Sequence, residues 1–222
     1  METVSRGVIN ARNALLQEMA LQSKHESAVA RVQEVCPEQR NLKLHLGCGF
    51  NIRPGWVNID LLSIRADLSL DLREPWPFPD CSVEAIYSEH MFEHLAYPTE
   101  VQHVLQESCR VLYPGGIFEV GVPDTDWVMQ SWSDPVADYW KYARELFHPP
   151  TCRTRMEHVN HHFRQDGQHL YAWDWETLRM VLRDAGFVEI RKRPWGDGDS
   201  PSRKLGTLYV SACNPINEEV RQ

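Results

Sequence analysis

The sequence predicts an α/β protein built on a doubly wound, mostly parallel sheet. From residue 42 onward, short apolar runs alternate with helical stretches, which is typical of parallel strands joined by crossover helices. The last two apolar runs are instead joined by a Gly/Asp/Ser/Pro-rich loop at 196–202, which favours an antiparallel terminal pair. The 222 residues fit a helical extension at 1–40 followed by one domain at 41–222.

Each element is expected from apolar periodicity and from the signals at its ends. Residues 8–35 contain no Pro or Gly and predict a helix that ends before Pro37. Two more helices are expected at 98–112, with Thr99 as N-cap, and at 174–185, with Asp174 as N-cap and Gly186 as terminator. Seven strands are expected, the third of them weak, at 42–46, 56–60, 66–70, 83–88, 116–122, 187–191 and 207–212.

Composition and charge limit the classes of function. Apolar residues make up 42% and charged residues 24%, within the range of globular proteins. A net charge of −8 makes a nucleic-acid partner unexpected. The chain shows neither an apolar signal segment nor a stretch long enough to span a membrane. Its six scattered cysteines form no CxxC pair. We therefore expect a reduced, cytoplasmic protein that is not integral to a membrane.

Two segments lie outside the alternating pattern. The insert at about 124–171 is rich in aromatic residues and histidine and is too long for a simple connection, so we expect a partly helical lid or small subdomain. Core packing is the commonest explanation of its aromatic residues, although rings beside polar groups also suit a sugar or an aromatic metabolite. The N-terminal helix carries a thin apolar stripe of Leu15, Met19, Val29 and Val32, for which packing on the domain is favoured and a homodimer contact is the alternative.

The segment most informative about function is 42–60, LKLHLGCGFNIRPGWVNID. An apolar strand leads into Gly47, Cys48 and Gly49, and a second strand ends at Asp60. Glycines at such a turn let a ligand lie against the backbone. An acidic residue that ends the next strand can accept both hydroxyls of a ribose. The segment therefore predicts a nucleoside-binding site.

Three segments in this order resemble class I S-adenosylmethionine (SAM)-dependent methyltransferases. They are 42–60, the stretch DLREPWPFPDCSVEAIYSEHMFEHL, and the stretch RVLYPGGIFEVGVPD. The resemblance covers roughly 42–122 and, more loosely, the last two strands. It implies a Rossmann-like sheet and SAM as cofactor. The positions that would contact SAM are Gly47, Cys48 and Gly49 (methionine and ribose), Asp60 and Leu61 (ribose), Asp71 and Leu72 (adenine), and Ser88 (sulfonium methyl).

The sequence departs from this family in two places. His45 stands where an acid is common, and only eleven residues separate Gly49 from Asp60. The usual spacing is ~20 residues, so there is no room for a full first crossover helix. The short span also argues against a nicotinamide-binding domain. The chain is most similar to a group of small methyltransferases with this shortened loop, which are often linked with glycan biosynthesis.

The expected reaction is methyl transfer to a hydroxyl on a saccharide or glycan precursor. A hydroxyl acceptor needs a base, and His90 and His94 follow the fourth strand directly, while His161 and His162 lie in the insert. One alternative is a methyltransferase for a small molecule such as a natural product, phenol or quinone. Another, of a different class, is a non-catalytic binding module that keeps the fold.

No metal is expected in the leading interpretation, but Mg²⁺ is an alternative. Glu89, Glu93 and His94 resemble the acidic and histidine cluster of some magnesium-dependent O-methyltransferases. Those enzymes show ExxEH, whereas this chain has ExxxEH. A divalent ion there would hold acceptor oxygens and lower the pKa of one of them.

Overall fold

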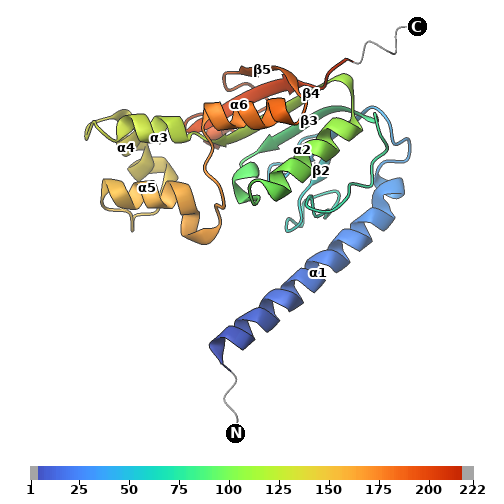
Figure 1. Ribbon diagram of the computed structural model, residues 1–222, viewed down its shortest axis with the longest axis horizontal. Helices are drawn as coiled ribbons and strands as arrows, with labels where there is room; N and C mark the ends of the chain where they lie inside the picture. Colours follow the sequence, from blue (N-terminus) through green and yellow to red (C-terminus); the bar gives the residue numbers. More distant parts are fainter. Residues whose placement is uncertain (1–4, 217–222) are drawn as a thin grey trace.

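The computed structural model describes residues 5–216, which contain one six-stranded sheet of order β2-β1-β3-β4-β6-β5 (Figure 1). The first four strands of the chain pair in parallel, and β6 is antiparallel to both β4 and β5. The expected α/β class, with a mostly parallel Rossmann-like sheet and an antiparallel terminal pair, is confirmed. The strands are β1 (Leu42–Leu46), β2 (Val57–Ile59), β3 (Val83–Glu89), β4 (Leu112–Pro123), β5 (Val188–Lys192) and β6 (Thr207–Cys213).

The expected count of seven strands was not met, because the weak strand at 66–70 is reduced to one bridge between Ile59 and Leu68. The carboxylate of Asp67 explains why the ladder is so short. Its Oδ2 accepts the backbone N–H of Asn58 at 2.7 Å, a donor that a longer strand pair would need.

The long helices agree with the expected positions. They are α1 (Arg6–Val35), α2 (Thr99–Val111) and α6 (Trp175–Asp184). Asp174 is confirmed as the N-cap of α6, because its side chain accepts a hydrogen bond from the N–H of Thr177 at 2.8 Å. The Thr99 cap was wrong: Pro98 holds the N-cap position, and Glu100 reaches back to the N–H of Ala96 at 2.7 Å. The carboxylate of Glu100 thus holds the residues that lead into the helix, and no side chain caps its first turn.

One face of the sheet is apolar and carries the helices. Leu44, Ile86 and Phe118 form one cross-strand row of this face and are fully buried. Helices α2 and α6 lie on it side by side (Figure 1), joined where the Cys109 thiol donates to the carbonyl oxygen of Ala185. Burial of this row supplies the main core of the domain.

The opposite face is polar across all six strands. One cross-strand row consists of Asn58, His45, Tyr87, Glu119, Ser211 and Arg191. A parallel sheet is normally covered by helices on both faces, but the shortened β1–β2 connection supplies no helix here. Loops cover the row instead: Arg53 of the 50–56 loop stacks on the Tyr87 ring at 3.3 Å, and Asp199 of the 193–206 loop accepts the Tyr87 hydroxyl at 3.0 Å.

The imidazole of His45 in this row makes stability dependent on pH. Burial lowers its pKa to about 4, although Asn58 hydrogen-bonds the ring. The unfolded chain therefore takes up this proton below about pH 6.5, whereas the folded chain stays neutral, and stability falls between pH 6.5 and 4. The wild type loses unfolding free energy between pH 7 and pH 5, and we expect this loss to be about 2 kcal/mol smaller in His45→Gln.

Urea denaturation at the two pH values measures this effect. His103→Gln, at a partly buried position of α2 away from this row, is the control and should leave the loss unchanged. An equal loss in wild type and His45→Gln would contradict the assignment.

The N-terminal helix α1 (Arg6–Val35) buries side chains against the domain only in its second half. Of the predicted stripe, Val32 is buried, whereas Leu15 and Met19 are exposed. In Figure 1 the first half of α1 extends away from the sheet. Its role as a dimer contact stays a prediction. Within residues 5–216, no helix is long and apolar enough to cross a membrane.

The insert between β4 and α6 forms a small helical subdomain with its own core. It contains α3 (Thr125–Ser131), α4 (Asp138–Tyr142) and α5 (Arg155–Arg164). Its core is formed by Val128, Tyr139, Trp140 and Ala143, with Trp127 and Phe163 packed against them. Core packing therefore explains most of its aromatic residues.

Candidate active site

The glycine turn after β1 has the backbone conformation that its sequence predicts. Gly47 and Gly49 have φ values of 65° and 51°, a region that side chains rarely enter. The two glycines differ in their surroundings. A Cβ at Gly47 would meet the Met91 side chain at 2.5 Å, whereas nothing lies within 4 Å of a Cβ at Gly49. The open space of the turn is therefore above Gly49.

The carboxylate of Asp60 holds this turn against the end of β2. Its Oδ2 accepts the N–H of Gly49 at 2.9 Å, and its Oδ1 accepts those of Leu62 and Ser63 at 2.9 and 2.7 Å. A carboxylate has about four acceptor sites, so three donors leave capacity for a ligand hydroxyl. Asp60 is only partly buried, which leaves the carboxylate accessible.

Asn58 replaces the missing first crossover helix as the organiser of the β1–β2 connection. Its Oδ1 accepts the N–H of Arg53 at 2.8 Å, and its Nδ2 donates to the carbonyl oxygens of Arg53 and Trp56. The side chain thus satisfies the backbone that a helix would otherwise satisfy internally. The short spacing noticed in the sequence corresponds to this compact turn.

Asp71 and Leu61, both predicted near the cofactor, contact the second half of α1. The N–H of Asp71 donates to Nδ1 of His25 at 3.2 Å, and Lys24 donates to the Leu61 carbonyl at 3.4 Å. Burial opposes ionisation of Asp71, but the Arg73 guanidinium, 2.7 Å away, outweighs this effect and lowers the Asp71 pKa. The Asp71 carboxylate is thus already paired.

Three consecutive residues at the end of β3 have different environments. The Ser88 hydroxyl is fully buried and has no hydrogen-bond partner among residues 5–216. Glu89 accepts the hydroxyls of Tyr209, at 2.6 Å, and of Ser200. His90 has a φ of 53°, and its Nε2 lies 2.9 Å from the Thr207 hydroxyl.

A histidine-lined cavity of about 310 Å³ opens beside His90. It lies where β3 and β4 end and β6 begins, under the helical insert. Five imidazoles line it together with Tyr139, Phe147 and Arg203; they are those of His90, His148, His161, His162 and His169. Because the glycine turn follows the adjacent strand β1, the turn and this cavity share the carboxyl edge of the parallel strands.

The buried imidazoles of this cavity are held in the neutral form. Burial, together with neighbouring histidines, lowers the pKa of His148 to about 3 and that of His162 to about 4. Burial also lowers the pKa of His90 well below its ordinary value. A neutral imidazole has one nitrogen lone pair free to accept a proton or to bind a metal.

Solved structures with a similar fold include three from archaea. A chain of the complex between the Haloferax volcanii Trm112 methyltransferase activator and a methyltransferase is 20% identical, with 91% of this chain and 94% of that chain covered and a TM-score of 0.47. A SAM-dependent methyltransferase from Archaeoglobus fulgidus is 15% identical (90% and 99% covered, TM-score 0.47). One from Methanosarcina mazei is also 15% identical (81% and 95% covered, TM-score 0.49).

Residues 44–120 match a family model described as a methyltransferase domain. The matched segment contains the glycine turn, Asp60 and the end of β3. This part of the chain is therefore similar to a methyltransferase domain. This agrees with the resemblance seen in the sequence, but it leaves the acceptor unassigned.

The structure gathers some of the predicted residues and separates others. Gly47, Gly49 and Asp60 are joined at one turn, where the thiol of the buried Cys48 donates to the Gly49 carbonyl oxygen. Leu72 is buried in the main core. Among the predicted bases, His90, His161 and His162 line the cavity and His94 does not.

The predicted magnesium ligands do not form one cluster. Glu89 is hydrogen-bonded to Tyr209 and Ser200. Glu93 and His94 instead lie beside His169, with one ligand atom of each within 4.8 Å of the others. Two imidazoles and one carboxylate are not the oxygen-only set that Mg²⁺ prefers. The sequence could not show this grouping, because His169 lies at the far end of the insert.

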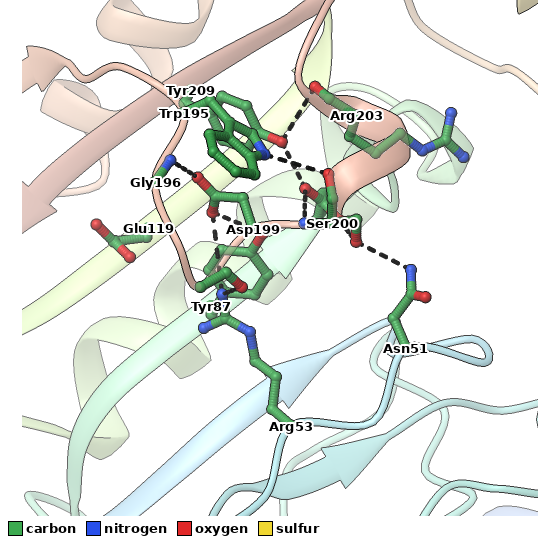
Figure 2. Close-up of polar contacts among 12 residues, drawn as sticks. Asn51, Arg53, Tyr87, Glu119, Trp195, Gly196, Asp199, Ser200, Arg203 and Tyr209 are labelled. Atoms are coloured by element: carbon green, nitrogen blue, oxygen red, sulfur yellow. Dashed lines mark hydrogen bonds and ion pairs between the residues drawn. The ribbon is translucent and has the colours of Figure 1, made fainter.

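Sequence reasoning missed a buried charge network on the polar face of the sheet (Figure 2). The Asp199 carboxylate accepts hydrogen bonds from both terminal nitrogens of Arg193, at 2.6 and 2.7 Å. It also accepts one from the backbone N–H of Gly196. Ser200, next in the chain, binds Glu89 and accepts from Asn51 of the β1–β2 connection. The 193–206 loop is thereby joined to the glycine-turn side of the domain.

Proposed function

We propose that the domain transfers a methyl group from SAM to a hydroxyl of a saccharide or glycan precursor bound in the histidine-lined cavity. The observation that carries this proposal is the position of the cavity, at the strand ends next to the glycine turn. Its volume of about 310 Å³ suits a small acceptor. Arg203 and the imidazoles offer polar contacts and Tyr139 offers an aromatic face, which is the combination that a sugar ring needs.

The residues of the glycine turn fit the cofactor. The free space above Gly49 admits a ligand against the backbone, and Asp60 retains acceptor capacity for ribose hydroxyls. When bound, SAM supplies an electrophilic methyl group on a sulfonium. Ser88, with its unpartnered hydroxyl at the end of β3, lies on the strand between the turn and the cavity.

The cavity histidines would act on the acceptor. A hydroxyl becomes a competent nucleophile as its proton leaves, and His90 and His162 present buried imidazoles in the cavity wall. His90 is positioned by the Thr207 hydroxyl, and His162 lies between the hydroxyls of Thr125, at 3.4 Å, and Tyr139, at 3.5 Å. The walls formed by the insert would limit the access of water to the acceptor.

We expect His90→Gln and His162→Gln each to reduce turnover, and the variant that removes the base to reduce it by about 100-fold. Binding of SAM should change less than twofold, because neither side chain lies at the glycine turn. Turnover is measured with labelled SAM over a panel of sugars, phenols and lipids, and SAM affinity by calorimetry. His103→Gln, outside the cavity, is the matched control.

The outcomes separate the alternatives. Transfer to sugars with loss in one histidine variant supports the proposal, whereas transfer only to phenols or quinones would reassign the acceptor. Full turnover in both variants would remove these histidines from the reaction. SAM binding without transfer to any class would favour a non-catalytic binding module.

A further inference from the structure

Three side chains converge at the base of the insert without taking part in the proposed transfer. Glu93 and His94 belong to the 3₁₀ turn η1 (Phe92–His94) that follows β3, and His169 follows the last turn of the insert. One ligand atom from each lies within 4.8 Å of the other two. Two backbone bonds fix the approach, because Leu170 and Tyr171 donate their N–H groups to the Glu93 carbonyl at 2.7 and 3.2 Å.

Both imidazoles are oriented by backbone carbonyl groups. Nδ1 of His94 lies 2.9 Å from the carbonyl oxygen of Gln168, and Nδ1 of His169 lies 2.8 Å from that of His162. A carbonyl oxygen only accepts, so each Nδ1 carries the hydrogen and each Nε2 carries a free lone pair. A hydrogen bond of this kind, on the far nitrogen, orients metal-binding histidines. Nε2 of His94 lies 3.9 Å from Oε1 of Glu93.

The carboxylate of Glu93 is the independent indication of a ligand. Its side chain is 2% exposed, and neither oxygen has a hydrogen-bond partner among residues 5–216. An unsatisfied buried carboxylate is costly to fold. The nitrogens close to it are imidazole atoms, such as Nδ1 of His90 at 3.4 Å. A bound cation would satisfy both oxygens.

We propose that Glu93, His94 and His169 bind one divalent first-row transition-metal ion of the zinc type. Two imidazoles and a carboxylate are a donor set for zinc and its neighbours rather than for Mg²⁺ or Ca²⁺. Such ligands lie about 2.0–2.2 Å from zinc, so the three groups need to approach each other by only small side-chain rotations. Three protein ligands leave a further coordination position.

The ion would join the methyltransferase core to its insert. Glu93 and His94 come from the link after β3, and His169 precedes the return of the chain to α6. His169 also lines the histidine cavity, so the ion would form part of the cavity's support. This inference does not depend on the acceptor or on methyl transfer.

Metal stoichiometry and affinity test the site directly. The full chain is treated with chelator, freed of it, and titrated with Zn²⁺ against a chromophoric indicator, and Co²⁺ absorption reports coordination. We expect the wild type to bind one Zn²⁺ ion tightly per chain. In His94→Gln and His169→Gln the affinity for Zn²⁺ should fall by at least about 100-fold, since each substitution removes one ligand. His103→Gln and His148→Gln are the controls and should bind as wild type does.

Two results would overturn the proposal. One is the absence of a tight equivalent in the wild type. The other is that His148→Gln no longer binds the ion tightly while His169→Gln still does. This result would place the ion among the other histidines of the insert.

The stability of Glu93→Gln gives a second, independent test. In chelator, this variant should melt at the same temperature as the wild type or higher, because it removes a buried carboxylate that lacks a partner. With Zn²⁺ in excess, the wild type should gain several degrees and the variant should not, because only the wild type binds the ion. A lower melting temperature of Glu93→Gln in chelator would show that protein groups already satisfy the carboxylate and would contradict the proposal.

Discussion

Replacing Asp60 by Ala is expected to weaken SAM binding by about 10- to 100-fold. One charge-assisted hydrogen bond to a ribose hydroxyl, contributing about 1.5–3 kcal/mol, would be lost. Calorimetric titration of SAM into the full-length variant measures this loss directly. The expectation depends on the acceptor capacity that Asp60 retains beyond its three backbone donors.

Because Asp60 also holds the glycine turn, a control must separate the two roles. Ser63→Ala loosens the same turn, since its hydroxyl donates to the Gly49 carbonyl and accepts from Arg65, but it keeps the carboxylate. It should bind SAM within a few-fold of wild type. If Ser63→Ala loses as much affinity as Asp60→Ala, the carboxylate acts only through the turn and is not a ribose ligand.

Replacing Asp199 by Ala is expected to lower the unfolding free energy by about 3 kcal/mol. The carboxylate is buried and accepts two bonds from Arg193 and one from Tyr87 (Figure 2). Its loss would leave a half-buried guanidinium and a buried hydroxyl without their main partner, a larger cost than loss of an exposed ion pair. Thermal melting should show a decrease of roughly 6–12 °C for a chain of this size.

The same loop supplies the control for this change. Asp197 lies two residues away and is exposed, so Asp197→Ala should melt within about one degree of wild type. Equal melting temperatures for the two variants would mean that the network in Figure 2 does not stabilise the loop on the sheet.

The alternation of strands and helices and the glycine turn could be predicted because local pattern determines them. Apolar runs such as 42–46 form buried strands wherever helices can cover them, and Gly47 and Gly49 adopt conformations that other residues avoid. The short distance to Asp60 also indicated correctly that no full helix follows β1. These features depend on neighbours in the sequence.

Features that depend on distant partners could not be predicted in the same way. The sequence places His94 directly after the fourth strand but does not show that its ring is held by the Gln168 carbonyl, at the far end of the insert. Asp199 was seen only as part of a loop, because its partners Tyr87 and Arg193 come from β3 and from the residue that follows β5. The 66–70 strand failed for a related reason, since one side chain, Asp67, takes the donor that the ladder needed.

The placement of the cofactor at the glycine turn is tested most directly by hydrogen–deuterium exchange with and without saturating S-adenosylhomocysteine. Slower exchange is predicted in peptides that cover 47–63, because the ligand would order the turn around Gly49 and the donors to Asp60. Peptides covering the exposed first half of α1 should exchange equally in both states. Protection confined to the insert, with none in 47–63, would contradict the account.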